Sequence, residues 1–283
     1  MNIFENKTDL NLYIDILKSQ NRTLGFVATM GALHLGHASL ITTGLNQNDF
    51  VVVSIFVNPT QFDNEEDLVK YPRTLDSDVD LLATISEEKI IVYAPSVDDI
   101  YGDNIISTSF SYDGLEHEME GRFRTGHFDG VGTIVKRLFE IIRPDKAYFG
   151  EKDFQQLMII KKLVKKHDLP VRVIGCKIYR AKDGLAMSSR NARLKPRYRE
   201  AAPFIYKILK SAKEKFGTNS ADTLTTWVTK QFAQNDVLEL EYFIIADIST
   251  LKTMTRKTNQ KSYRAFIAVY ADDIRLIDNI ALN

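Results

Sequence analysis

In the first 176 residues, short apolar runs alternate with stretches in which apolar residues recur at helical spacing. Uninterrupted apolar runs rich in β-branched residues predict strands buried on both faces, at residues 24–29, 50–57, 90–93, 146–149 and 171–174. The helically spaced stretches predict helices at residues 8–17, 75–85, 131–142 and 153–167, the first of them capped by Thr8. Strands and helices in alternation predict an α/β fold, a doubly wound parallel sheet of Rossmann-like type.

Beyond residue 176 the pattern changes. A polar crossing at residues 179–191 leads to helices expected at 196–216 and 221–233. Strands follow at 239–248, 263–270 and 274–278, the last two joined by a turn at Asp272-Asp273. We therefore expect two domains, a Rossmann-like domain over residues 1–176 and a smaller α+β domain over residues 177–283.

Composition excludes several classes of protein. Lys plus Arg and Asp plus Glu number 37 each, so the net charge is zero, and a nucleic-acid or membrane-surface partner is not expected. The single cysteine, Cys176, allows neither an internal disulfide nor a thiolate zinc cluster. No leader-like segment precedes the first helix and no apolar run is long enough to span a membrane, so we expect a cytoplasmic protein.

One stretch of the sequence carries the first candidate chemistry. An apolar strand ends before Met30-Gly31, and a helical pattern begins after His34 and His37, which are three residues apart. A helix that starts after a glycine turn leaves backbone N–H groups unpaired, and these attract anions, above all phosphate. Both imidazoles fall on one face of the first turn, and Gly36 lets a phosphate approach the backbone. Zinc is the competing ligand, but no third ligand lies at useful spacing.

Two further polar motifs follow predicted strands directly, namely residues 58–61 and residues 150–153. In a parallel sheet, ligands bind beyond the carboxyl ends of the strands, so we expect the three motifs to open onto one crevice. Lys152 would supply a point charge for phosphate chemistry there, although most lysines are simply solvated.

Two more segments are candidates for ligand contact. Ser188, Ser189 and Arg190 combine hydroxyls with a forked donor that suits an oxyanion, and the simpler interpretation is a helix cap. The stretch 111–132 is long, charged and rich in glycine, which predicts a mobile lid.

Taken together, these motifs resemble a known family. His34-x-Gly36-His37 with a later Met187-Ser188-Ser189-Arg190 is similar to the paired signatures of the His-x-Gly-His nucleotidyltransferase superfamily. Within it, the sequence resembles the pantothenate synthetase (pantoate–β-alanine ligase) family over nearly the whole chain and in the family's order. The blocks that carry this resemblance are residues 29–37, 53–62, 71–74, 149–157, 180–191 and 275–279.

The resemblance implies an AMP-forming ligase of coenzyme A biosynthesis. Such an enzyme condenses (R)-pantoate with β-alanine to give pantothenate, through a pantoyl adenylate, and releases AMP and pyrophosphate. It implies ATP as a substrate and Mg2+ as its companion ion, with no dedicated metal cage of protein ligands. It also implies a homodimer joined through the N-terminal domains.

The resemblance also assigns residues, carried over by matching position. His37, the family's proton donor, is expected to act in catalysis with His34, Lys152, Ser188 and Arg190. Residues 150–153 would hold ribose and phosphate, Tyr179 would contact adenine through its backbone, and residues 187–190 would close over the triphosphate. The expected ATP-binding set is Met30, Gly31, Ala32, Leu33, His34, Leu35, Gly36, His37, Gly150, Glu151, Lys152, Asp153, Tyr179, Met187, Ser188, Ser189 and Arg190.

Three amide side chains are the expected substrate contacts. Gln61 and Gln156 resemble the family's pantoate clamp, Gln61 lying also at the β-alanine site, and Asn58 belongs to the same motif. Neutral amides orient the pantoate hydroxyls and carboxylate without an ion pair that would weaken the nucleophile.

The chain departs from the family pattern at Ala28, Leu35 and Thr125, none of which is assigned a catalytic role. Two other functions stay open at this point. One is an adenylyltransferase of the same superfamily in which the nucleotide remains on the product. The other is a nucleotide-binding sensor without catalysis, although the intact set of candidate residues argues against it.

Overall fold

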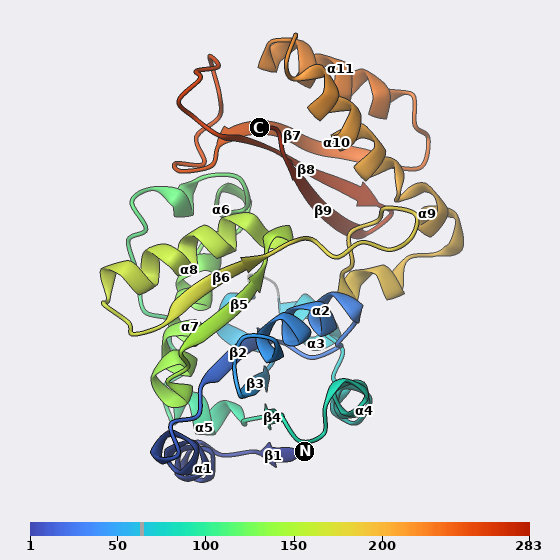
Figure 1. Cartoon of the computed structure of the whole chain (residues 1–283). Helices are drawn as coiled ribbons and strands as arrows, with labels where there is room; N and C mark the ends of the chain where they lie inside the picture. Colours follow the sequence, from blue (N-terminus) through green and yellow to red (C-terminus); the bar gives the residue numbers. More distant parts are fainter. Residues whose placement is uncertain (63–64) are drawn as a thin grey trace. The chain divides into compact units, whose positions relative to one another are not determined.

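A computed structural model describes residues 1–62 and 65–283 of the chain (Figure 1). Contacts within the chain divide it into two compact units. Unit 1 consists of residues 1–151 and 155–177, and unit 2 consists of residues 152–154 and 178–283. The short segment 152–154 therefore belongs with the C-terminal part of the chain, although its neighbours on both sides belong to unit 1.

Unit 1 is built on a six-stranded parallel sheet with the strand order β1-β4-β3-β2-β5-β6. Its strands are β1 Asn2–Phe4, β2 Leu24–Thr29, β3 Phe50–Ile55, β4 Ile90–Tyr93, β5 Lys146–Gly150 and β6 Arg172–Cys176. The predicted parallel α/β sheet is confirmed. The sequence pattern missed only β1, which is three residues long and largely exposed.

The helices of unit 1 lie along the connections between these strands (Figure 1). They are α1 Lys7–Ser19, α2 Leu35–Leu45, α3 Glu65–Lys70, α4 Leu75–Ile85, α5 Val97–Tyr101, α6 Glu120–Phe123, α7 His127–Ile142 and α8 Phe154–Lys166, with the 3-10 turns η1 Pro59–Gln61 and η2 Leu115–His117. Most of a further 3-10 turn, η3 Glu151–Asp153, and the first residue of α8 belong with unit 2. The cap of α1 is not Thr8. Asn6 occupies that position, because its side-chain oxygen accepts a hydrogen bond from the backbone N–H of Asp9.

The segment 111–132, predicted to be a lid loop, contains regular structure. It forms η2, α6 and the first turns of α7. Two of its glycines mark close packing. A Cβ at Gly130 would lie 2.2 Å from the Thr60 carbonyl oxygen, and one at Gly132 would lie 2.0 Å from the Tyr112 hydroxyl. The glycine-rich composition therefore reflects helix packing here, at least over α7.

Unit 2 is an α+β structure around a three-stranded antiparallel sheet, as the sequence pattern predicts. Its strands are β7 Glu239–Asp247, β8 Tyr263–Ala271 and β9 Ile274–Ala281, in the order β7-β8-β9. Its helices are η4 Ser189–Arg193, α9 Pro196–Ala201, α10 Phe204–Lys215 and α11 Ala221–Ala233. The single helix expected at 196–216 is divided at Pro203, which has no backbone N–H to continue the hydrogen-bond ladder. The apolar faces of α10 and α11 and the sheet form one buried cluster.

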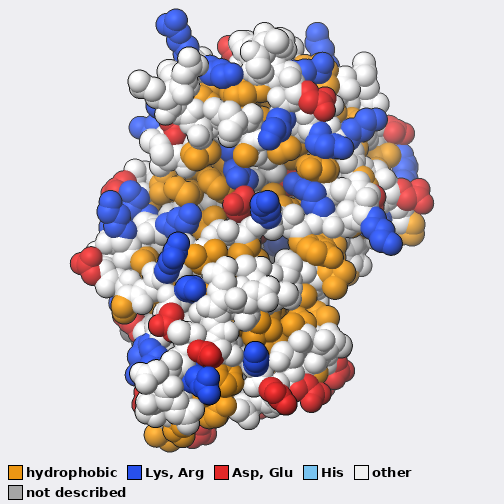
Figure 2. Space-filling view, in the orientation of Figure 1, with side chains coloured by type: hydrophobic (Ala, Val, Ile, Leu, Met, Phe, Trp, Pro, Cys, Tyr) orange, Lys and Arg blue, Asp and Glu red, His pale blue; other side chains and the backbone are white. Residues whose placement is uncertain are grey.

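Two negative findings concern the described residues. Among them, no helix is long and apolar enough to cross a membrane. The same part of the chain holds no group of three or more His, Cys, Asp or Glu side chains placed to bind a metal ion. Figure 2 shows basic and acidic side chains interspersed over the visible face, in keeping with the zero net charge.

Candidate active site

Three sequence motifs of unit 1 follow three neighbouring strands. Strand β2 lies between β3 and β5, so the segment after Thr29 is flanked by those after Ile55 and Gly150. From β2 the chain continues to β3 and β4 on one side, and it later forms β5 and β6 on the other side of β2. The carboxyl ends of β2 and β5 therefore mark the topological switch point, where doubly wound sheets bind ligands. Residues 30–37, 58–61 and 150–151 therefore begin at the same end of three neighbouring parallel strands. That the whole motif 150–153 opens onto one crevice with the other two stays a prediction.

The two histidines of the first motif cap helix α2. His34 is the N-cap, and its Nδ1 accepts a hydrogen bond from the Gly36 N–H at 3.0 Å. The backbone N–H of His34 in turn donates to Nδ1 of His37 at 3.4 Å. The two rings stack with centroids 4.1 Å apart. Because Nδ1 is the acceptor in both neutral rings, Nε2 carries the proton in each. The turn therefore presents imidazole N–H donors of defined tautomer.

A buried carboxylate holds the turn that precedes the histidines. Asp78, on α4, is 2% exposed, and its two oxygens accept hydrogen bonds from the Ala32 N–H at 3.0 Å and the Leu33 N–H at 2.6 Å. Gly31 and Ala32 have φ angles of 83° and 49°, the left-handed conformation that turns these N–H groups toward the carboxylate. Burial raises the pKa of Asp78 above its usual value, and the hydrogen bonds from Leu33, Thr74 and Ala32 oppose that rise.

These contacts correct one expectation. The backbone N–H groups of the turn were expected to be unpaired, but those of Gly31, Ala32, Leu33, His34 and Gly36 all have acceptors within the protein. The physical reason is that an N–H left unpaired in a half-buried turn is costly. At this helix start, the N–H groups of residues 31–34 and 36 therefore already have acceptors.

The second motif forms a short turn that joins two sets of candidate residues. Gln61 ends η1, and its Nε2 donates to the Met30 Sδ at 2.9 Å, which links the expected substrate amide to the expected ATP segment. Asn58 is buried and donates from Nδ2 to the Gln61 Oε1 at 3.2 Å, while its Oδ1 accepts from the Tyr101 hydroxyl at 2.6 Å. The structure thus brings Met30, Asn58 and Gln61 together.

Side chains at the end of α6 and the start of α7 hold the backbone of the same turn. The carbonyl oxygen of Gln61 lies 2.8 Å from Nδ1 of His127 and 3.4 Å from an Arg124 guanidinium nitrogen, which donates to it. A carbonyl only accepts, so His127 donates from Nδ1. His127 is buried at the first turn of α7. Its side chain therefore fixes where η1 places Gln61.

The third candidate amide, Gln156, is half-buried in the first turn of α8. Its neighbour Gln155 is buried and has a different role. Gln155 accepts from the Glu120 N–H at 3.0 Å and donates to the carbonyls of Leu115 and Glu118 at 2.8 and 2.6 Å. Gln155 therefore attaches the segment that contains η2 and α6 to the start of helix α8.

The remaining candidates belong to unit 2. The Lys152 side chain is largely buried and lies 3.8 Å from the Asp153 carboxylate, and the Lys152 carbonyl accepts from the Asn279 side chain at 2.8 Å. Residues 179–187 form a small hairpin, in which Arg180 bridges Ala186 and the Met187 N–H donates to the Tyr179 carbonyl at 3.0 Å.

The serine–arginine motif follows this hairpin. Ser188 is the N-cap of η4, and its Oγ accepts from the Arg190 N–H at 3.3 Å. Ser188 is thus a cap, but of η4. The helix that begins at Pro196, for which the simpler interpretation would make this segment the cap, has Lys195 as its N-cap. A cap and a ligand contact are compatible, because a serine hydroxyl has both a donor and two acceptor lone pairs.

Sequence reasoning missed three side chains that position the candidates, namely Asp78, His127 and Asn279. Asp78 lies shortly after the block 71–74 and Asn279 lies within the block 275–279, whereas His127 follows the departure from the family pattern at Thr125. Asp78 alone offered a signal, as a polar residue inside a predicted helix, since a buried polar residue needs a partner.

The fold and the side chains at its switch point define a Rossmann-like α/β enzyme. The family model described as pantoate-beta-alanine ligase matches residues 2–281. The chain belongs to the pantoate–β-alanine ligase family, and it is a ligase that condenses pantoate with β-alanine.

Named relatives and solved structures agree with this assignment. The chain is 56% identical to the pantothenate synthetase of Christiangramia forsetii, over all of both chains, and 57% identical to that of Flavobacterium psychrophilum, with the same coverage. The crystal structure of the Thermus thermophilus pantothenate synthetase matches 100% of this chain and 99% of its own, with a TM-score of 0.91 and 34% identity. The Francisella tularensis pantoate-beta-alanine ligase, complexed with beta-gamma ATP and beta-alanine, matches 100% of this chain and 98% of its own, with a TM-score of 0.82 and 36% identity.

Proposed function

We propose that the chain makes pantothenate from (R)-pantoate and β-alanine in two steps that consume ATP. In the first step, a pantoate carboxylate oxygen bonds to the α-phosphorus and the bond to the β-phosphate oxygen breaks, giving pantoyl adenylate and pyrophosphate. In the second, the amine of β-alanine bonds to the acyl carbon and loses a proton, and AMP leaves with the oxygen that pantoate supplied. Full-length similarity to ligases of this name supports the reaction, and the F. tularensis complex supports ATP and β-alanine as ligands.

The candidate residues divide the work by chemistry. His34 and His37 present protonated Nε2 atoms, which suit the phosphates, and His37 is the proton donor toward the leaving pyrophosphate. Lys152, Ser188 and Arg190 stabilise the charge that grows during transfer. ATP is bound by residues 30–37, 150–153, 179 and 187–190. Mg2+ enters with the nucleotide, whose phosphates supply ligands for it.

Pantoate is held by Gln61 and Gln156, and Gln61 also faces β-alanine. The single observation that best supports this assignment is the contact of Gln61 with Met30, which joins the expected acceptor turn to the expected ATP turn within unit 1. The N-terminal domain, residues 1–176, binds nucleotide and pantoate, and the C-terminal domain, residues 177–283, acts as the lid. The active form is a cytoplasmic homodimer joined through the N-terminal domains.

An isotope experiment tests the reaction most directly. The protein is incubated with ATP, Mg2+, β-alanine and pantoate labelled with 18O in its carboxylate, and the products are analysed by mass spectrometry. We expect one labelled oxygen in AMP, together with unlabelled pyrophosphate, and loss of turnover in EDTA. Formation of ADP with label in inorganic phosphate contradicts the adenylate. Dinucleotide formation with another acceptor indicates a different adenylyltransferase, and ATP binding without pantoate-dependent pyrophosphate release indicates a sensor.

A further inference from the structure

The last motif that resembles the family, residues 275–279, has no part in the proposed chemistry, yet it contains two of the most buried polar residues of unit 2. Asp278 and Asn279 are adjacent on β9 and are 5% and 1% exposed. Polar groups this deeply buried are stable only when they are hydrogen-bonded. Their partners therefore indicate what the pair does.

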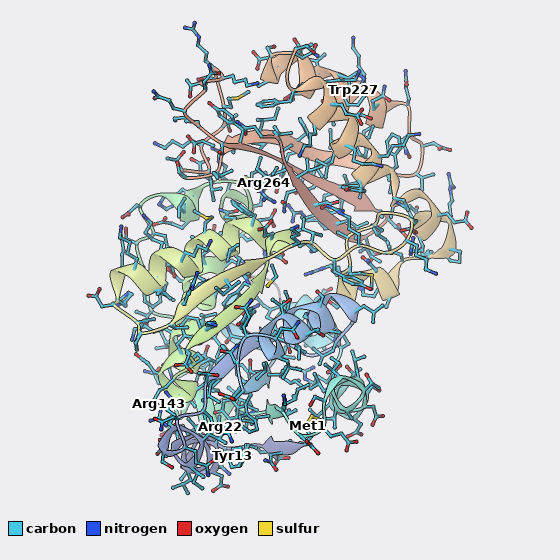
Figure 3. All side chains as sticks on the ribbon, viewed as in Figure 1. Met1, Tyr13, Arg22, Arg143, Trp227 and Arg264 are labelled. Atoms are coloured by element: carbon cyan, nitrogen blue, oxygen red, sulfur yellow. The ribbon has the colours of Figure 1, made fainter. Side chains whose placement is uncertain are left out.

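Asn279 binds the Lys152 segment. Its Nδ2 donates to the Lys152 carbonyl at 2.8 Å, and its Oδ1 accepts from the Arg264 guanidinium. A guanidinium group can only donate hydrogen bonds, so the Asn279 atom that faces Arg264 must be the amide oxygen, and the NH2 group faces Lys152. Arg264 lies on β8, where Figure 3 labels it.

A second contact holds the same segment two residues further on. The Arg264 guanidinium carbon lies 4.2 Å from the centre of the Phe154 ring, and that ring packs against Phe266 with centroids 6.0 Å apart. Phe266 is the register partner of Asn279 across β8 and β9. The segment 152–154 is therefore attached to the sheet of unit 2 at both ends, which explains why it groups with that unit.

Asp278 binds the other candidate ATP segment of unit 2. Its two carboxylate oxygens accept from Arg180 at 2.6 and 2.9 Å, a bidentate pair of fixed geometry. Arg180 also donates to the Gly184 carbonyl at 3.1 Å and stacks 3.7 Å from the centre of the Tyr206 ring. These contacts shape the hairpin that leads into Ser188 and Arg190.

We infer that Asp278 and Asn279 are positioning residues for adenylation: they hold the Lys152 segment and the hairpin before Ser188 on one strand. The inference rests on the proposed role of Lys152 and deepens it. Lys152 and Ser188–Arg190 keep their mutual geometry because neighbouring residues of β9 bind both segments. Neither Asp278 nor Asn279 needs to touch ATP.

The test uses Asn279→Asp in the full chain. This variant keeps an oxygen for Arg264 but replaces the NH2 donor by a second oxygen, which repels the Lys152 carbonyl. Glu241→Gln is the matched control, because it removes the carboxylate that pairs with Arg275 of β9 at 2.7 Å and leaves Asp278 and Asn279 unchanged. Asn279→Ser, which is too short to reach Lys152, replaces Asn279→Asp if the latter fails to fold.

The first measurement is pantoate-dependent pyrophosphate release in a single turnover. We expect Asn279→Asp to slow it by about 10- to 100-fold, since a misplacement of about 1 Å can cost 10² in rate, and we expect Glu241→Gln to match the wild type. In a Lys152→Ala background, Asn279→Asp should add less than about 2-fold, because its effect passes through Lys152. An equal loss in both backgrounds, or no loss in the wild-type background, overturns the inference.

The second measurement does not depend on activity. Hydrogen exchange of a peptide covering residues 151–156 should accelerate in Asn279→Asp and stay unchanged in Glu241→Gln. Unchanged exchange in both variants overturns the inference even if the protein proves to be a sensor. Faster exchange with no pantoate-dependent turnover in the wild type leaves the positioning of Lys152 standing and refutes the proposed function instead.

Discussion

The candidate residues of the two units are held in place over very different distances along the chain. In unit 1, hydrogen bonds that span two or three residues position His34 and His37. In unit 2, Lys152 is bound by a side chain 127 residues later, and Arg180 by one 98 residues later. The first arrangement follows from local chain geometry, and the second exists only once β8 and β9 have paired.

The difference teaches where each kind of substitution should act. A change in the histidine turn removes a donor from the chemistry and a cap from α2 at once, so the two effects must be separated by the choice of replacement. A change in β9 removes a support and leaves every ligand-contacting side chain in the sequence. Asp78 lies between these cases, because it binds the histidine turn from 45 residues away.

The largest effect is expected for His34. Asparagine is among the best N-caps, so His34→Asn keeps the bond to the Gly36 N–H and removes only the imidazole Nε2. We expect adenylation to slow by about 10²–10³, as for the loss of an electrostatic stabiliser, at wild-type thermal stability. His34→Ala should lose the same rate and also about 0.5–2 kcal/mol of stability. Single-turnover pyrophosphate release and thermal melts measure both, and wild-type turnover in His34→Asn refutes the phosphate role.

The next effect tests whether the turn of unit 1 also needs distant support. Asp78→Ala leaves the N–H groups of Ala32 and Leu33 without their acceptor, which costs about 1–3 kcal/mol for each buried donor. We expect adenylation to slow by about 10-fold or more because the turn relaxes. Asp80→Ala, an exposed position of the same helix, is the control for charge and helix propensity. Equal rates in the two variants would show that the turn keeps its geometry without Asp78.

The same contrast explains what could be predicted from sequence. Apart from β1, the described strands follow from patterns within about ten residues and were predicted, as was the histidine turn after β2. Asn279 gave no such signal, because its partner Lys152 lies 127 residues earlier in the chain. Its position next to that partner depends on the register of β9 on β8, in which Asn279 lies opposite Phe266. His127 was placed in a loop, since the sequence does not show that Gly130 lies against the backbone of Thr60.

Local signals also failed where two residues could serve one role. Asn6 and Thr8 are both good N-caps, and the structure uses Asn6, whose side chain reaches the Asp9 N–H. Glycines in residues 111–132 suggested mobility, whereas Gly132 admits the Tyr112 hydroxyl against α7. Composition alone does not distinguish a glycine that frees the backbone from one that makes room for a neighbour.

A smaller effect is expected at Gln61, whose side chain contacts nearby Asn58 and whose backbone carbonyl accepts from the distant His127. Gln61→Ala should raise the KM for pantoate about 10-fold, the value of one hydrogen bond of about 1.4 kcal/mol, with little change in the KM for ATP. Gln61→Glu should raise it further, because a carboxylate repels the carboxylate of pantoate. Steady-state kinetics with each substrate varied in turn measure the split. A rise in the KM for ATP alone would place Gln61 at the nucleotide and remove it from the pantoate clamp.

The smallest effect on rate, and the one that isolates the fold of unit 2, is expected at Asp247. Burial raises the pKa of this carboxyl, but hydrogen bonds from Lys261 and Ser249 more than offset it and lower the pKa from 3.8 to about 2. A lowered folded pKa contributes stability that is present above about pH 4 and lost as the pH falls toward 2. Asp247→Asn should therefore cost about 2 kcal/mol at pH 7, by about 1.4 kcal/mol per pKa unit, and much less near pH 2, with turnover unchanged.

Denaturant unfolding at the two pH values measures this difference. Asp236→Asn is the control, because its partner Arg197 and its own carboxylate are exposed and such pairs contribute little. If Asp247→Asn also slowed adenylation, the loss of the carboxylate on β7 would have altered β9 through the pairing of β8 with both strands. The geometry of Lys152 would then depend on the stability of the whole sheet, in addition to the contacts of Asp278 and Asn279. An unchanged rate would confine the support of Lys152 to that pair, in contrast to the histidine turn, whose support combines bonds within the turn with those of Asp78.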